Sequence, residues 1–534
     1  DYNVGVGIGS LGANTVGSKS TAIGTNALFT QNPASAADMF NVGLGYHAGF
    51  AITTGVQNTL IGGLAGDATT TASNNTALGY LALSANTTGS VNTAIGVASL
   101  DANTTGANNV AVGGGALGAN TTADNNTAVG KDALVANTTG TLNTATGYRA
   151  LQGNTTAGNN TAFGADALYT NTTGGSNTAV GLNALVSNTT ASNNTAVGYV
   201  ALGANTTGAS NVAVGSGALD ANTTGTGNIG IGVTALGANT TAGEGTGVGD
   251  GCLAVNTTGA LNSAFGAQTL AACTTGSANT AIGGYALNDL TTAAENVAVG
   301  ATALASNTTA SHNTAIGNAA LTANTTGTNN VAVGAYTLDA NTTASNNTAV
   351  GRDALTANTI GFSNTAVGSL CLDAMVSGDY NVAIGTLSLS TDTTGNKSTA
   401  IGYGALNVQN VTDGADMFNT AVGFSAGAAI TTGVQNTLIG SLCGDALSTG
   451  FNNVAMGYFA LGGEDTGRKN VAIGVSALKI QNSDADNFNT AVGFEAGQAV
   501  TTGTNNTFVG GLAGDGTDDG TSNTAVGKGA LSAN

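Results

Sequence analysis

The sequence predicts an all-β protein, a parallel β-solenoid (β-roll) with about 17 residues per coil and about 31 coils. The same unit recurs from Val4 to Thr524, without insertion or deletion between Val42 and Thr399. Gly occupies the fourth position of all 31 units, and the unit is too short for the helix pair of an α-helical repeat. Aromatic residues make up only 4%, too few for several globular cores. We therefore expect residues 1–534 to form a single continuous solenoid.

The unit Thr76–Asn92 illustrates the expected elements, with positions numbered 1 to 17. Positions 1 to 3 (Thr or Val, Ala, Val or Ile) predict one strand. Positions 7 to 10 (Ala-Leu-x-Ala) predict a second, which Asn-Thr-Thr at positions 11 to 13 extends or follows with a third. Gly at positions 4 and 14 suits corners, where a positive φ or a close backbone approach is needed. We expect Val or Ile at position 3 and Leu at position 8 to fill a narrow core.

Stacked coils turn each position into a ladder with a spacing of about 4.8 Å. One coil buries too little apolar surface to fix its own backbone, so stability has to come from contacts between neighbouring coils. The Asn ladder at position 17 is expected to hydrogen-bond amide to amide. The predicted structural ladders are the corner glycines Gly79, Gly96 and Gly113, the core leucines Leu83, Leu100 and Leu117, and the asparagines Asn92, Asn109 and Asn126.

The second position is Ala in 24 of 31 units. Because side chains alternate across a strand, Ala at position 2 is expected to face away from the core residue at position 3. A solvent-facing ladder would tolerate Ser, Lys or Asp. We therefore favour the interpretation that this Ala face packs against another chain. The alternative is that Ala merely fits a tightly twisted coil.

Three groups of units, 21–75, 399–453 and 471–523, depart from the pattern. Each begins with a lengthened unit, and the next two units carry Gly in place of Leu at position 8 but gain an apolar residue elsewhere. We interpret this as core volume that is moved rather than lost. The lengthened units are predicted to make lateral or ligand contacts, and the alternative is a tolerated insertion with local repacking. The candidate contact residues are Asp38, Met39, Phe40, Asp416, Met417, Phe418, Asp486 and Phe488.

A longer period is superimposed on the short one, because the segment beginning at Asp1 recurs at Asp379, an offset of 378 in the numbering. The chain thus begins a second super-repeat and stops inside it. We expect the chain to be a window on a longer protein.

The Asn-Thr-Thr ladder is the predicted surface feature that offers the most groups for hydrogen bonding, modification or binding. If Leu at position 8 faces inward, positions 11 and 13 fall on the outward parity. Plain ladder hydrogen bonding is the favoured interpretation. N-glycosylation is the second, because each Asn-Thr-Thr is an acceptor sequence. A flat threonine array that binds ice is the third. The candidate glycan acceptors are Asn86, Asn103, Asn120 and Asn137.

Composition excludes several classes of function. Nine Lys and Arg against 28 Asp and Glu give a net charge of −19, so no basic stripe for nucleic acid can form. No apolar run approaches the roughly 18 residues of a membrane-spanning helix, so this segment is not expected to insert into a membrane.

The four cysteines Cys252, Cys273, Cys371 and Cys443 are expected to be buried small residues. No catalytic pattern, metal site or cofactor motif is visible, and we predict no enzymatic activity.

The rhythm Ser/Thr-x-Ala-Ile/Val-Gly-x-x-Ala resembles the head repeat of trimeric autotransporter adhesins, and the Asn-Thr-Ala-Val-Gly form is similar to repeats of phage tail-fibre-like and bacterial surface proteins. That adhesin repeat is shorter than the unit found here. The resemblance implies a left-handed β-roll, a homotrimer or filament, and an extracellular place on a microbial surface or virion. We predict a structural fibre or filament shaft, an adhesin-like rod. The alternative is a tail-fibre-like module that binds surface glycans.

Overall fold

A computed structural model describes residues 2–532, and its regular elements are strands joined by turns. The chain divides into two compact units, Asp1–Asn262 and Ser263–Asn534, each described by itself. Each unit is a stack of parallel coils, and the predicted β-solenoid with about 17 residues per coil and about 31 coils is confirmed. Across the described residues no helix is long and apolar enough to cross a membrane.

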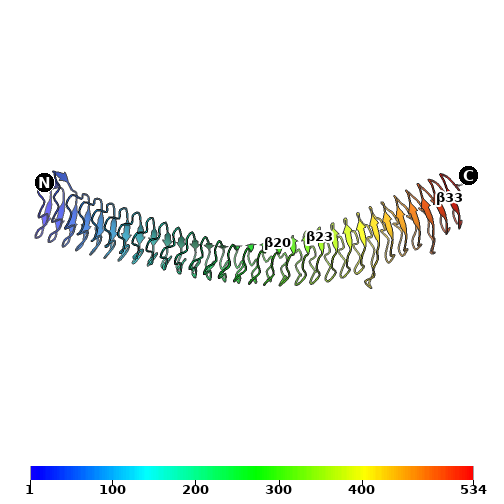
Figure 1. The fold of residues 1–534 in the computed structure, drawn as a ribbon, viewed down its shortest axis with the longest axis horizontal. Helices are drawn as coiled ribbons and strands as arrows, with labels where there is room; N and C mark the ends of the chain where they lie inside the picture. The colour runs from blue at the N-terminus through cyan, green and yellow to red at the C-terminus, as the bar shows by residue number, and fades with distance from the viewer. Residues whose placement is uncertain (1, 533–534) are drawn as a thin grey trace. The chain divides into compact units, whose positions relative to one another are not determined.

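The strands of the first unit are three residues long, apart from two short strands beside a lengthened turn. Consecutive strands pair in parallel with every residue opposite its equivalent in the next coil, as in Thr93 opposite Val110. Within each unit, Figure 1 shows the strand arrows following one another as rungs in chain order. The strands are β1 (Val4–Val6), β2 (Gly17–Ser18), β3 (Thr21–Ile23), β4 (Ala37–Asp38), β5 (Val42–Leu44), β6 (Thr59–Ile61), β7 (Thr76–Leu78), β8 (Thr93–Ile95), β9 (Val110–Val112), β10 (Thr127–Val129), β11 (Thr144–Thr146), β12 (Thr161–Phe163), β13 (Thr178–Val180), β14 (Thr195–Val197), β15 (Val212–Val214), β16 (Ile229–Ile231) and β17 (Thr246–Val248).

The second unit repeats the same pattern, and its consecutive strands also pair in parallel and in register. Its strands are β18 (Ser263–Phe265), β19 (Thr280–Ile282), β20 (Val297–Val299), β21 (Thr314–Ile316), β22 (Val331–Val333), β23 (Thr348–Val350), β24 (Thr365–Val367), β25 (Val382–Ile384), β26 (Thr399–Ile401), β27 (Thr420–Val422), β28 (Thr437–Ile439), β29 (Val454–Met456), β30 (Val471–Ile473), β31 (Thr490–Val492), β32 (Thr507–Val509) and β33 (Thr524–Val526).

The inward side of the strand is opposite to the expected one. Ala at position 2, as in Ala94, is fully buried within its own coil, whereas Ile23 and Val129 at position 3 are 38% and 37% exposed. The prediction that the position-3 ladder fills the core is therefore wrong, as is the prediction that the Ala face packs against another chain. The reason is space. A Cβ atom at position 2, built on Gly247, would lie 3.4 Å from the Cγ atom of Leu236 in the preceding coil, so the core leucines leave room for little more than a methyl group.

The predicted second strand is also wrong, because positions 5 to 10 form a series of turns. Positions 6 and 8 have left-handed backbones, with φ of 59° at Leu81 and 57° at Leu83. Such a conformation costs an L-residue roughly 1–2 kcal/mol. Burying the Leu side chain contributes roughly 1.5–3 kcal/mol, which offsets the strain. Leu83, Leu100 and Leu117 are fully buried, beside the small residue at position 7.

Position 4 is the corner that ends each strand. Gly79, Gly96 and Gly113 have φ of 145°, 132° and 138°. A Cβ atom on Gly79 would lie 2.5 Å from the carbonyl oxygen of Gly96 in the next coil. Both the φ and the contact between coils require glycine, which explains why all 31 units have it.

The other half of the interior is polar and consists of two asparagine columns. At position 17 the side-chain Oδ1 accepts from the backbone N–H of the next column member, as in Asn109 to Asn92 at 3.0 Å. Its Nδ2 donates to the position-14 carbonyl of the next coil, as in Asn92 to Gly106 at 2.9 Å. Amide-to-amide bonding, expected at position 17, occurs mainly at position 11. There each Nδ2 from Asn103 to Asn239 donates to the Oδ1 one coil earlier at 2.8–3.1 Å.

The irregular groups rearrange the interior without emptying it, as the sequence predicts. Gly49 and Gly66 replace Leu at position 8, and Ile52 and Leu60 fill the space with fully buried side chains. A Cβ atom on Gly66 would lie 2.8 Å from Leu60 Cδ2. The larger side chain at position 2 is therefore accommodated only because the facing leucines are absent.

Candidate functional site: the outward strand face and the lengthened turns

The outward strand face comprises positions 1, 3 and 5 of each coil. Position 3 is apolar in 30 of 31 coils, the exception being Thr146, and none of these side chains is buried. Phe163 is 57% exposed and Leu78 is 45% exposed. A contiguous apolar column on a protein surface indicates an interaction site more than scattered single residues do.

Position 5 adds large exposed side chains beside this column. In the first unit Tyr46, Tyr80, Tyr148 and Tyr199 are 47–58% exposed. In the second unit Tyr403 and Phe424 stack with their ring centroids 5.4 Å apart. Aromatic rings are enriched in protein interfaces because they bury much area with few rotatable bonds.

The outward strand face carries almost none of the charge of the molecule. Positions 1 and 3 hold no charged residue in any coil, and position 5 holds four, namely Lys131, Asp250, Arg352 and Lys528. These four residues sum to +2, so the other surfaces carry a net charge of −21. Copies of the chain that approach through this face avoid most of their mutual repulsion.

Each lengthened turn contacts the preceding coil through the same cluster of a lysine, an aspartate and a phenylalanine. A lysine at position 16 pairs with an aspartate of the lengthened turn and lies over its phenylalanine ring. The Nζ–Oδ2 distances are 2.7 Å for Lys19–Asp38, 2.6 Å for Lys397–Asp416 and 2.6 Å for Lys469–Asp486. The distances from Nζ to the ring centroids are 5.1 Å at Phe40, 5.2 Å at Phe418 and 4.8 Å at Phe488.

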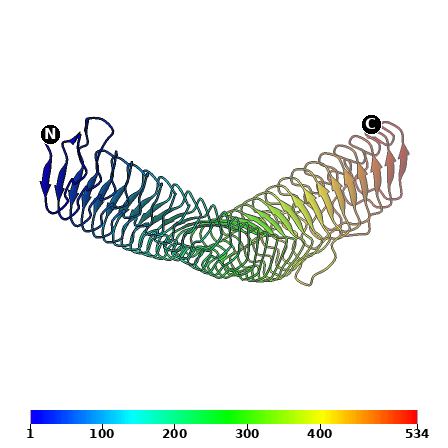
Figure 2. The ribbon, with the colours of Figure 1, turned by 60° about the vertical axis from the view of Figure 1, so that its left-hand side comes forward.

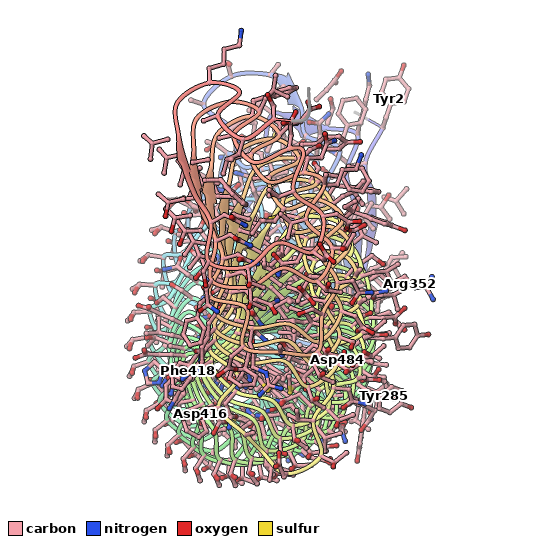
Figure 3. The ribbon with its side chains drawn as sticks, turned by 90° about the vertical axis from the view of Figure 1, so that its right-hand side faces the viewer. Tyr2, Tyr285, Arg352, Asp416, Phe418 and Asp484 are labelled. Atoms are coloured by element: carbon pink, nitrogen blue, oxygen red, sulfur yellow. The ribbon has the colours of Figure 1, made fainter. Side chains whose placement is uncertain are left out.

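The charges of the cluster are paired within it, because each lysine forms an ion pair with the aspartate of the same turn. The hydrogen bond from Lys19, followed by one from Ser18, lowers the pKa of Asp38 below its usual range. Asp416 and Phe418 lie on one side of the second unit in Figure 3, and Tyr285 and Arg352 on the other. Figure 2 shows one loop projecting from the coils in each unit. The lysines could have been found from the sequence, because four of the nine cations of the chain, Lys19, Lys397, Arg468 and Lys469, directly precede a lengthened unit.

Not every predicted contact residue reaches the surface. Asp38, Phe40, Asp416, Phe418, Asp486 and Phe488 are exposed, but Met39 and Met417 are fully buried. The prediction that these methionines make external contacts is therefore wrong. The extra residues of a lengthened turn open space inside the coil, and the methionine side chain fills it.

The predicted glycan acceptors face the interior of the coil rather than the solvent. Asn86, Asn103, Asn120 and Asn137 are fully buried at position 11. The Nδ2 atom of Asn103 donates to Asn86 Oδ1 at 2.9 Å and to the Gly106 carbonyl at 2.9 Å, so a sugar has neither room nor a free amide. The prediction of outward asparagines is wrong because positions 5 to 10 are turns and position 11 lies outside any strand, so strand alternation does not apply there.

Position 13 does face outward, and threonine occupies it in every coil from Thr54 to Thr258 of the first unit. The threonine before it uses its hydroxyl on the backbone, as in Thr87 Oγ1 to the Thr104 carbonyl at 3.0 Å. The exposed column is therefore a single file of hydroxyl groups. The ice-binding alternative depends on this column and stays a prediction.

The reactive side-chain types are dispersed or buried. Burial raises the pKa of the Cys252 and Cys443 thiols to about 12 and of the Cys273 and Cys371 thiols to about 11. Across residues 2–532 no three His, Cys, Asp or Glu side chains are placed to hold a metal ion.

Two carboxyl groups of the second unit, Asp392 and Glu464, are buried in the position-11 column. Asp392 Oδ2 accepts from Gln409 Nε2 at 2.6 Å, and its Oδ1 accepts from Gly395 N at 2.9 Å. Glu464 Oε2 accepts from Gln481 Nε2 at 2.7 Å in the same way. Burial raises the pKa of Asp392 despite its hydrogen bonds.

A comparison with models of known protein families finds no match, and a comparison with curated proteins finds none either. The resemblance to adhesin and tail-fibre repeats therefore stays a prediction, carried by the residues of the repeat alone.

Proposed function

We propose that this chain is a non-catalytic structural segment of an extracellular fibre or filament, and that it self-associates through the outward strand face. The observation that carries the proposal is the half-exposed apolar column at position 3, which is present in each of the two units. A homotrimer or a filament on a microbial surface or virion would cover this column.

The size of the face supports a stable association. Burying a whole Val or Ile side chain is worth roughly 1.5–3 kcal/mol. At roughly 25 cal/mol per Å², this corresponds to about 60–120 Å² of apolar surface. A residue that is about 40% exposed therefore offers roughly 25–50 Å². Over the fifteen coils of the first unit, position 3 provides about 400–700 Å², and the tyrosines at position 5 bring the total near the roughly 800 Å² per partner of a standard interface.

Repetition supports the same conclusion. Two copies share one axial spacing of about 4.8 Å, so a contact made by one coil recurs at the next. A buried interior of hydrogen-bonded asparagines and leucines makes each coil depend on its neighbours, which suits a rigid, protease-resistant shaft.

The test is the oligomeric state of the full chain, measured by light scattering after size-exclusion chromatography and by electron microscopy. We expect a self-associated wild type and a largely monomeric Phe163→Glu/Tyr199→Glu variant. Leu261→Glu is the matched control, because Leu261 is 56% exposed but lies at position 16. A monomeric wild type, or association that survives the double variant, would contradict the proposal.

A further inference from the structure

The outward strand face of the first unit carries two charged residues, Lys131 and Asp250. Both lie at position 5, both are exposed, and they are seven coils apart. The face holds no charge in the six coils between them, where Tyr148, Leu182 and Tyr199 at position 5 are 46–58% exposed. A protein interface has an apolar centre and a polar rim. The segment from Lys131 to Asp250 therefore has the composition of a single interface.

Asp250 has no counter-charge near it in its own chain. No lysine or arginine occurs between Arg149 and Arg352. Arg149, in the first unit, is six coils from Asp250, or about 29 Å at roughly 4.8 Å per coil, and salt screens charges beyond about 8 Å. The Lys131 ammonium is accessible, because its side chain is 70% exposed and its Nζ lies 3.9 Å from the Asp132 Oδ2 atom. One apolar face thus presents an anion without a partner and an accessible cation.

Position 5 forms one edge of the outward strand face, and position 1 forms the other. The Asp132 backbone N–H donates to the Gly114 carbonyl at 3.0 Å, so position 5 stays in register from coil to coil. Two such faces with aligned stacking axes can meet in two ways. If the axes are parallel, the strands of the two copies run in opposite directions, and position 5 meets position 1. If the axes are antiparallel, the strands run in the same direction, and position 5 meets position 5.

Only the antiparallel arrangement lets the two charges meet. Position 1 is Thr, Val, Ile or Ser in every coil, so parallel axes would set Lys131 and Asp250 against uncharged side chains. Covering a charge without giving it a partner costs free energy. With antiparallel axes, Lys131 of one copy can lie opposite Asp250 of the other. Two-fold symmetry then repeats this ion pair at the far end of the segment.

We propose that the outward strand face of the first unit binds a second copy of this chain in antiparallel orientation, with Lys131 of each copy opposite Asp250 of the other. In this register Leu182 meets Tyr199 beside the two-fold axis, and Phe163 meets Val214. The inference rests on the proposed self-association and adds its direction and its register. A cyclic trimer keeps its three chains parallel and cannot form these pairs.

The first experiment measures the self-association constant of the full chain by analytical ultracentrifugation. Lys131→Glu and Asp250→Lys each place like charges opposite one another, and each is expected to weaken association at least about tenfold. The double variant restores opposite charges and should return to within about threefold of the wild type. Lys479→Glu and Asp289→Lys are the matched controls, because they make the same changes of charge at positions 9 and 10, outside the face.

A second experiment reads the register directly. Ala165 and Ser216 lie at position 5 and should meet in the antiparallel pair. A mixture of the Ala165→Cys and Ser216→Cys variants, oxidised mildly, is expected to give a disulfide-linked heterodimer. Ala165→Cys alone should not cross-link, because the two introduced thiols would lie three coils apart, or about 14 Å, beyond disulfide reach. The four native cysteines are buried and do not interfere.

Several outcomes would overturn the antiparallel pair while leaving self-association intact. They are a trimeric wild type, charge variants no weaker than their matched controls, no linked heterodimer, or rescue of Asp250→Lys by Arg352→Glu instead of Lys131→Glu. In each of these cases the Phe163→Glu/Tyr199→Glu variant would still separate the copies. A monomeric wild type would instead contradict the proposed function itself.

Discussion

Regular coils and irregular coils solve the same packing problem in different ways. In regular coils of the first unit Leu fills position 8, Ala lines position 2, and asparagines from Asn86 to Asn256 run through position 11. In the irregular coils that begin at Val42 and Thr59, the leucine is gone, Leu60 takes position 2 and Ile52 takes position 11. The apolar columns thus exchange volume with one another and with the polar column.

The position-17 asparagines do not take part in this exchange. Asn41, Asn58 and Asn75 continue the column through the irregular coils, with the same bond from each backbone N–H to the preceding Oδ1 at 2.9–3.0 Å. A dispersion contact can be replaced by any side chain that fills the space, whereas a buried carbonyl needs a donor at one place. The comparison teaches that the position-17 column is kept within the irregular coils. In the coils just before the first two lengthened turns, Ser20 and Ser398 replace the asparagine, and Gln31 and Gln409 donate a hydrogen bond to the serine hydroxyl.

The largest effect is therefore expected from Asn126→Ala at position 17. The change leaves the Asn143 backbone N–H without a partner and removes one of the two side-chain donors to the Gly140 carbonyl, which Asn137 Nδ2 still reaches at 2.9 Å. A buried unsatisfied group costs about 1–3 kcal/mol and a lost hydrogen bond about 1 kcal/mol, so we expect a loss of roughly 2–4 kcal/mol in the unfolding free energy. Hydrogen exchange of the adjoining strands measures it, and Asn125→Ala at exposed position 16 is the control. Equal protection in both variants would refute the special role of the column.

Volume exchange is tested next by Gly66→Leu, which restores the regular residue in an irregular coil. Because its Cβ atom would lie 2.8 Å from Leu60, we expect overpacking to cost about 1–3 kcal/mol. Adding Leu60→Ala recreates the regular arrangement and should recover most of the loss. Thermal unfolding of Gly66→Leu, Leu60→Ala and the double variant gives the coupling free energy between the two positions. If the changes in stability were additive, the two side chains would not share a space.

A smaller, pH-dependent effect is expected for Asp392→Asn. The folded pKa of Asp392 is raised, so its favourable contribution is present below the unfolded pKa and is lost as pH rises through the folded value. The equivalent residue one super-repeat earlier is Asn14, whose Nδ2 donates to the Gly17 carbonyl at 2.9 Å. The melting temperature of the variant relative to wild type should therefore rise between about pH 4 and pH 7. Asp413→Asn, at an exposed position, should show no such trend.

The smallest effect is expected where a lengthened turn meets the preceding coil. Lys397 and Asp416 are each 40% exposed, and exposed ion pairs contribute about 0–1 kcal/mol. Lys397→Met should change the unfolding free energy by less than about 1 kcal/mol, with the difference from wild type shrinking in high salt. A loss larger than that of Gly66→Leu would mean that the ion pair, rather than the buried Met417, holds the turn in place.

Part of the candidate site could be predicted from the sequence. The lengthened turns stand out as breaks in the period, and six of their eight candidate residues do lie on the surface. The buried methionines could not be recognised, because an inserted residue is assigned a direction only when the path of the loop is known. The outward strand face could not be recognised, since the sequence predicts that its position-3 residues fill the core.

The repeat length and the corner glycines by themselves determined a solenoid coil, because a period this short, with glycine at the fourth position of every unit, leaves no room for a helix pair. Only the tertiary structure decided which side of the strand is the interior. Both alternating residues are apolar, so the pattern fits either direction equally well. The choice depends on the leucine at position 8 in the preceding coil, which lies against position 2 and leaves space there for alanine but not for valine or isoleucine.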